Sequence, residues 1–161
     1  MRNRTFGVLA VSIVLVLAFA GSASALSASA GAGGLAGSAT SVETNTENTV
    51  VAKASANYTG VVNGGGVTFA WECDGQGIGA AAATSMVRCY LSTNGSEYDA
   101  PNQINLPGNV VASAQTATLD FDEIGDTVRV CAVVRVLPII GSSATATACV
   151  DEGVGIDPAT T

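Results

Sequence analysis

The feature that most constrains this chain is a strict two-residue alternation of apolar and polar side chains near its C-terminus, between residues 126 and 150. Because successive side chains of a β-strand point to opposite faces, this period predicts a β-hairpin with one buried face. Cys131 and Cys149 both belong to the polar set, so we expect a cross-strand disulfide on the outer face. The apolar set consists of Val128, Val130, Ala132, Val134 and Val136 before the loop, and Ala144, Ala146, Ala148 and Val150 after it.

The same alternation recurs along the chain in short segments that turn residues separate. The turns include Asn63-Gly64-Gly65-Gly66 and Asn94-Gly95, and Asn-Gly is the strongest short hairpin signal. No stretch has a helical period of useful length. About seven strands, one every dozen or so residues, predict an all-β sandwich of two antiparallel sheets. The strands are expected near residues 50–59, 67–73, 85–91, 103–106, 110–121, 127–136 and 144–150.

The N-terminus has the three parts of a secretory signal peptide: a basic start, a short apolar run and an Ala-x-Ala site. The run is shorter than the roughly 20 residues that a membrane-spanning helix needs. We therefore expect a signal peptide over 1–25, cleaved after Ala25 or, as the alternative, after Ala30. Residues 26–47 are mostly Ala, Gly, Ser and Thr and predict a flexible leader. The sandwich domain is then expected over 48–152, with a flexible tail over 153–161.

The exported chain is strongly acidic. Without the signal peptide it holds four basic residues against thirteen acidic ones, a net charge of −9. A nucleic-acid backbone would be repelled by such a surface, so we expect no nucleic-acid partner. We also expect no membrane insertion after signal cleavage. The acidic residues are spread along the chain, which is typical of a protein kept soluble outside the cell.

The four cysteines predict two disulfides in an exported chain. Three connectivities are possible. Local pairing of Cys73 with Cys89 and of Cys131 with Cys149 matches the side-chain faces, inward for the first pair and outward for the second. The alternative, Cys73 with Cys131, would imitate the bridge between the sheets of antibody domains but requires Cys131 to point inward. We expect no metal site, because zinc would require close cysteine pairs or histidine and the chain has no histidine.

One set of short motifs extends from the middle of the chain to its C-terminal hairpin: Cys73, the run 79–84, Val87-Arg88-Cys89, Asn94-Gly95, Leu106-Pro107-Gly108, Val130-Cys131 and Ala148-Cys149. Together these motifs resemble a family of short, secreted actinobacterial β-sandwich proteins that is largely uncharacterised. This resemblance covers about residues 67–150 and implies an immunoglobulin-like fold with two hairpin disulfides, but no activity. The architecture is also similar to that of neocarzinostatin-type chromophore carriers, although the cysteine spacings are longer here. Secreted subtilisin inhibitors share the composition, but their reactive-loop cysteine motif is absent.

The residues offer little for catalysis. Without histidine there is no Ser-His or Cys-His pair, so we expect no enzyme, no catalytic residues and no cofactor. The acidic run 120–126 begins like a calcium-binding EF-hand loop. Ile124 and Cys131 stand where oxygen ligands are required, however, so the motif fails.

One loop is unusual, because Leu137, Pro138, Ile139 and Ile140 form an apolar stretch where a hairpin loop is normally polar. Exposed, such a patch often marks a contact surface. Folded back, the same side chains would cap the end of the sandwich. We expect a non-enzymatic secreted or cell-surface interaction module that binds an unknown protein. The alternatives are a carrier of a small apolar ligand and an inhibitor of an extracellular protease.

Overall fold

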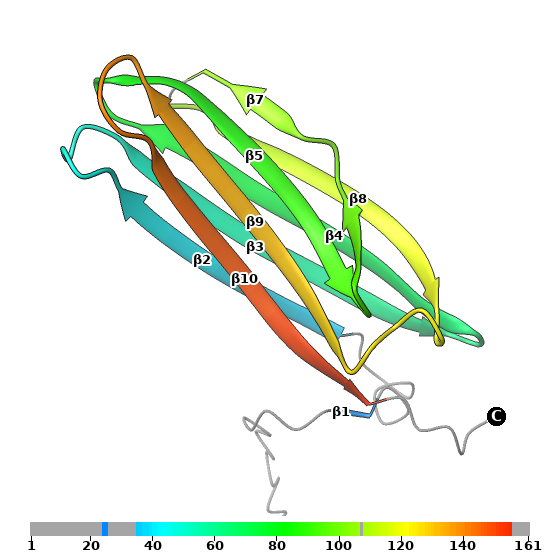
Figure 1. The fold of residues 1–161 in the computed structure, drawn as a ribbon. Helices are drawn as coiled ribbons and strands as arrows, with labels where there is room; N and C mark the ends of the chain where they lie inside the picture. Colours follow the sequence, from blue (N-terminus) through cyan, green and yellow to red (C-terminus); the bar gives the residue numbers. More distant parts are fainter. Residues whose placement is uncertain (1–23, 26–34, 107, 156–161) are drawn as a thin grey trace, which may run out of the picture.

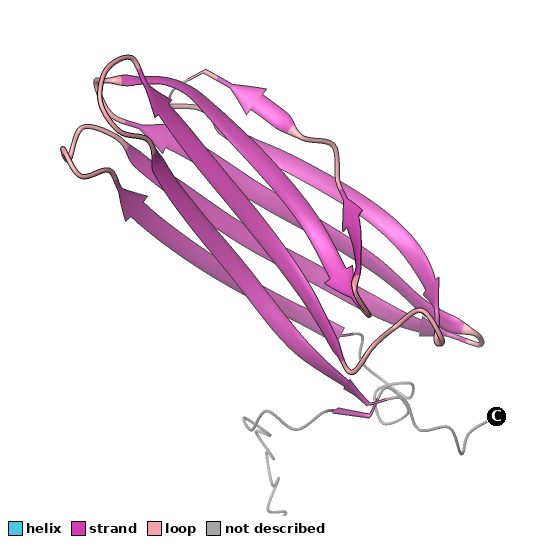
Figure 2. Ribbon diagram, viewed as in Figure 1, coloured by secondary structure: helices cyan, strands magenta, loops and turns pink. Residues whose placement is uncertain are grey.

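The computed structural model describes residues 24–25, 35–106 and 108–155, and the described chain is all-β. Two sheets face each other, with their loops gathered at the two ends (Figures 1 and 2). The pairings within both sheets are antiparallel except for the short parallel contact of β1 with β10. The strands are β1 (Ser24–Ala25), β2 (Leu35–Thr44), β3 (Val51–Asn63), β4 (Gly66–Ile78), β5 (Ala82–Thr93), β6 (Ser96–Asp99), β7 (Gln103–Asn105), β8 (Val110–Asp120), β9 (Thr127–Pro138) and β10 (Ala144–Gly155).

The chain divides its strands between a four-stranded and a six-stranded sheet. The four-stranded sheet has the order β2-β3-β4-β8, and the other has the order β1-β10-β9-β5-β6, with β7 also paired to β5. The described chain therefore crosses between the sheets after β4, after β7 and after β8. The predicted hairpin of β9 and β10 is present, with Cys131 directly opposite Cys149.

The prediction of a flexible leader over 26–47 is wrong for residues 35–44, which form β2 and pair with β3 over ten residues. At one position of this segment, Gly37, a small residue is required because the space is tight. At Gly37, an added Cβ would lie 2.5 Å from the ring of Tyr58 and 2.7 Å from Val150. The sandwich therefore begins at Leu35 instead of residue 48, and β10 extends it to Gly155. Residues 45–47, the end of the predicted leader, form the turn that follows β2, whereas the predicted signal peptide, except Ser24–Ala25 in β1, and residues 26–34 and 156–161 lie outside the described residues.

The core lies between the sheets, where the predicted inward faces meet. Trp71, Phe69 and Leu91 are its largest fully or almost fully buried side chains. Toward one end the sheets pack especially closely. A Cβ at Gly75 would lie 2.2 Å from Val87, and one at Gly77 would lie 2.9 Å from Val136. Glycine is thus required in β4 to allow this approach.

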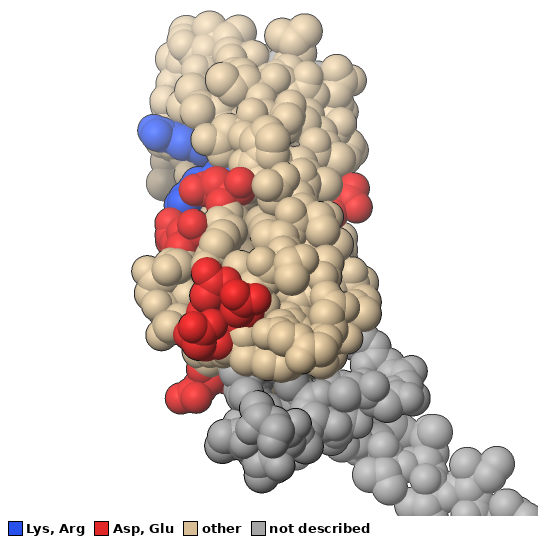
Figure 3. Space-filling view, turned by 90° about the vertical axis from the view of Figure 1, so that its right-hand side faces the viewer, with Lys and Arg blue, Asp and Glu red and all other residues tan. Residues whose placement is uncertain are grey.

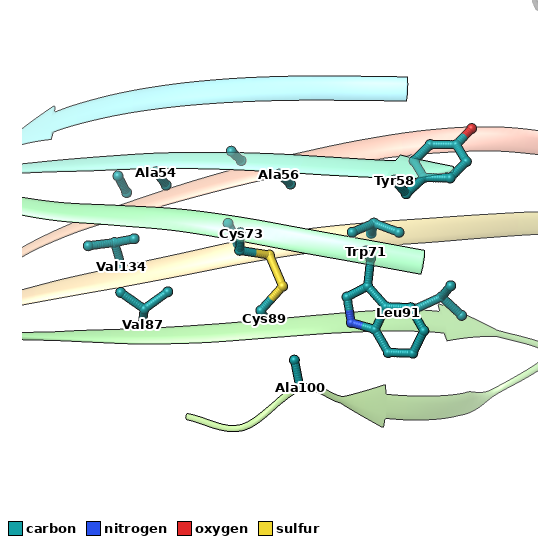
Figure 4. Packing of buried hydrophobic residues seen from close by; sticks show 14 of the residues in the cluster. Ala54, Ala56, Tyr58, Trp71, Cys73, Val87, Cys89, Leu91, Ala100 and Val134 are labelled. Carbon is teal, nitrogen blue, oxygen red and sulfur yellow. A yellow bond between two sulfur atoms is a disulfide. The ribbon is translucent and has the colours of Figure 1, made fainter. Parts of the chain in front are cut away.

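Both predicted disulfide pairs are present, but one of them does not close a hairpin. Cys73 on β4 and Cys89 on β5 are both fully buried, and because these strands belong to different sheets, the bridge joins the sheets (Figure 4). The expected hairpin there is wrong, since β5 pairs with β9 instead of β4. The alternative pair comes close in space: the sulfur of Cys73 lies 3.5 Å from the backbone oxygen of Cys131. The side chain of Cys131 alternates with the core residues Val130 and Ala132, however, and bonds to exposed Cys149 on the outer face.

Candidate functional site

The candidate site is the tip, which we define as Leu137, Pro138, Ile139 and Ile140 at the end of β9. Leu137 and Pro138 are half-buried and pair with the start of β5. Ile139 and Ile140 are 73% and 82% exposed, more than any other large apolar side chain in the described chain. Of the two arrangements open from the sequence, capping of the core therefore does not apply to these two isoleucines.

Asn45 supports the tip from the neighbouring β2–β3 turn and is itself buried, with 5% of its surface exposed. Its side-chain oxygen accepts hydrogen bonds from the backbone N–H groups of Thr49 and Val50, at 2.8 and 3.0 Å. Its amide nitrogen donates to the backbone oxygen of Ser142 at 3.1 Å. One side chain thus holds its own turn and attaches it to the β9–β10 loop. Sequence reasoning missed this residue, because an asparagine in a polar turn carries no signal of a long-range partner.

Glu47 makes a second connection between the same two loops. Its carboxylate accepts hydrogen bonds from the hydroxyl and, at 3.4 Å, from the backbone N–H of Ser142. The Ser142 hydroxyl, the largest cause, lowers the pKa of Glu47 below its ordinary value. Gly141, directly before Ser142, has a φ of +103°, a conformation that glycine adopts without strain, and its position faces the Glu47 carboxylate.

The other side of the tip is held by the connection between β4 and β5. The backbone N–H of Ile139 donates to the oxygen of Ala81 at 2.7 Å. The β4–β5 connection, which holds Ala81, therefore lies at the same end of the molecule as the tip. The two isoleucines project from a loop that is hydrogen-bonded on both flanks.

Three hollows in the described residues lie away from the tip and are open to solvent. One of about 240 Å³ lies on the outer face of the four-stranded sheet, lined among others by Val42, Lys53 and Val110. A second, of about 230 Å³, lies on the same sheet beside Asn57 and Glu72. A third borders the Asn94-Gly95 turn. None of these three is enclosed between the sheets.

Several charged side chains away from the tip form exposed ion pairs. Figure 3 shows acidic groups in the lower half of one face and none at the upper end of that face. Arg88 bonds to Glu97 and Asp99, which raises its pKa, and its guanidinium also lies 4.3 Å from the centre of the Tyr90 ring. Arg129 pairs with Asp151, and this hydrogen bond lowers the pKa of the carboxyl. These pairs are exposed, so solvent screens them and they contribute little to stability.

The acidic run 120–126 forms a turn that bonds to itself, since the Glu123 carboxylate accepts a hydrogen bond from the backbone N–H of Asp120 at 2.9 Å. Within the described residues there is no group of three or more His, Cys, Asp or Glu side chains placed to hold a metal ion. That part of the chain also contains no helix with the length and apolar character to cross a bilayer.

We compared the chain with known proteins. The chain matches no protein-family model, no curated protein and no solved structure.

Proposed function

We propose that this protein is a non-enzymatic, secreted or cell-surface interaction module that binds a partner protein through its tip. The observation that carries the proposal is the exposure of Ile139 and Ile140, at 73% and 82%. Leaving two adjacent large aliphatic side chains in water forgoes about 1.5–3 kcal/mol of burial for each. A partner with an apolar groove would recover that free energy on binding.

The hydrogen bonds around the tip support the same proposal. Ile139 is held by Ala81, and the following Ser142 is held by Asn45 and Glu47. A loop that is already ordered loses little conformational entropy when it binds, so more of the contact energy appears as affinity.

We also propose that the sandwich is immunoglobulin-like. The order β3-β4-β8 in one sheet and β10-β9-β5-β6 in the other corresponds to the A-B-E and G-F-C-C′ arrangement of that fold, with β2 as an additional edge strand. A location outside the cell is supported by the two disulfides, which persist in oxidising compartments.

The test is a pulldown that compares the tagged wild-type protein with the double variant Ile139→Ser/Ile140→Ser. Each protein is incubated with culture supernatant and cell-wall extract of its own host. We expect the wild-type protein to retain a partner that the double variant fails to retain. The unfolding midpoint should fall by less than about 3 °C, because little apolar surface is buried at either site.

The matched control is Ile104→Ser, since Ile104 on β7 is 69% exposed but lies outside the tip. This variant should retain the partner as the wild type does. A large drop in the midpoint of the double variant would instead show that the isoleucines support the core, and equal retention by all three proteins would remove the tip as the contact.

A further inference from the structure

The edges of the two sheets differ in how they are protected from pairing with another strand. On the six-stranded sheet, β6 and β7 have four and three residues. On the opposite side of the sandwich, β2 lies beside β10, with Gly37 against Val150, and the Tyr58 hydroxyl of the neighbouring β3 donates to Glu152 of β10. Short, charged or covered edges resist addition of a further strand.

Strand β8 has none of these protections along most of its length. It runs for eleven residues, pairs with β4 without a register shift, contains no proline or glycine, and carries a single charge, Asp120, at its end. Of its side chains, Ser113 bonds across to the backbone oxygen of Pro101, but this contact does not occupy the strand's backbone. Among the described edges, β8 is long and carries no charge before its last residue.

The direction of the free backbone groups follows from one hydrogen bond. The N–H of Phe121 donates to the oxygen of Gly65, its opposite residue in the β4–β8 register. Antiparallel pairs alternate between hydrogen-bonded and non-hydrogen-bonded, so the odd-numbered residues of β8 bond to β4. The even-numbered residues therefore turn their N–H and C=O groups to the open side. Those in the middle of the strand are Ala112, Ala114, Thr116 and Thr118.

From this geometry we infer that β8 pairs antiparallel with β8 of a second copy of this chain, about a two-fold axis at Gln115. The two four-stranded sheets then become one continuous eight-stranded sheet. In this register Ala114 lies opposite Thr116 of the partner and Ala112 opposite Thr118. These pairs and their symmetry mates form about eight new backbone hydrogen bonds.

The placement of charge on β8 favours a second copy in this orientation. In the antiparallel arrangement each Asp120 lies opposite Val110 of the other copy, so the two carboxylates are at opposite ends of the interface. A parallel arrangement would set like charges side by side, which is destabilising. The same register places Val111 opposite Leu119, whose side chain already packs in the core of its own copy.

The test uses sedimentation velocity of the secreted protein over a range of concentrations. We expect a dimer that is lost in Ala114→Pro, because proline removes an outward N–H and blocks the approaching strand. The fold should persist, since proline is tolerated in an edge strand where the N–H faces solvent. Ala114→Ser, which keeps the N–H, should remain dimeric. So should Ser38→Pro, which makes the same change on the opposite edge of the sheet.

Charge variants decide the question even if the proline variant does not fold. Gln115→Lys and Gln115→Glu should each lose the dimer at low ionic strength, because like charges meet at the axis, and a mixture of the two should regain it. A wild-type protein that is monomeric throughout would overturn the inference. So would a folded Ala114→Pro protein that stays dimeric, or a charge mixture that fails to associate. None of these results bears on the tip, whose residues all variants retain.

Discussion

Asn45 connects the two loops beneath the tip through hydrogen bonds to Thr49, Val50 and Ser142. We predict that Asn45→Ala destabilises the fold by about 1–3 kcal/mol, because the buried N–H of Val50 then loses its acceptor. Urea denaturation monitored by tryptophan fluorescence measures this change. Asn57→Ala, at an exposed position of β3, is the control and should be nearly neutral. A neutral Asn45→Ala would mean that water replaces the lost bonds.

Glu47 makes the other connection sensitive to acid. Its pKa is lowered below the ordinary value of 4.5, with the Ser142 hydroxyl as the main cause. A lowered pKa stabilises the folded protein fully above pH 4.5, and this contribution disappears as the pH falls through the folded-state pKa. We predict that wild type exceeds Glu47→Gln in stability above pH 4.5 and that the difference vanishes in stronger acid. Denaturation curves of both proteins over that range provide the measurement, and a pH-independent difference would contradict the assignment.

At the scale of elements, the two disulfides differ in what they contribute to stability, although the loops that they close are nearly equal in length. The sequence separations are 16 and 18 residues, so loop closure favours the two bridges almost equally, by about 3 kcal/mol each. Cys73–Cys89 also fills the core between the sheets, whereas the other bridge joins Cys131, which is buried but outside the core cluster, to the exposed Cys149. We predict that Cys73→Ala/Cys89→Ala costs at least about 1 kcal/mol more than Cys131→Ala/Cys149→Ala, because it leaves a cavity. Chemical denaturation of the two double variants gives the comparison, and equal losses would argue against a packing role for the inner bridge.

At the scale of the whole molecule, the proposed tip and the inferred β8 pairing are compatible. The β8 strand starts at the end that holds the tip, as the hydrogen bond from the Gly108 N–H to Gly77 indicates. An antiparallel two-fold pair would therefore place the tips of the two copies at opposite ends of the dimer. Such a dimer would present two separate contacts, and bivalent binding raises the overall affinity where both contacts can be engaged at once.

The sequence alone determined the features that depend on local periodicity and side-chain chemistry. Alternation of Val and Ala with polar residues predicted the β9–β10 hairpin, and the same alternation placed Cys131 outward and Cys73 inward. Both disulfide pairs are as expected from those faces. These predictions succeed because the two-residue period of a strand is imposed by its own backbone, whichever strands it later joins.

Only the tertiary structure shows which sheet each strand joins and which small residues are needed for close packing. The β4–β5 connection looked like a hairpin, yet it crosses between the sheets, because β5 finds its partner in β9, about 45 residues later in the chain. The segment 35–44 looked too poor in apolar groups to fold, yet Gly37 fits beneath Tyr58. The exposure of Ile139 and Ile140 likewise depends on bonds from Ala81, Asn45 and Glu47. Contacts between segments far apart in the sequence stabilise these arrangements. The pattern of residues along a single strand does not show which strands will pack beside it.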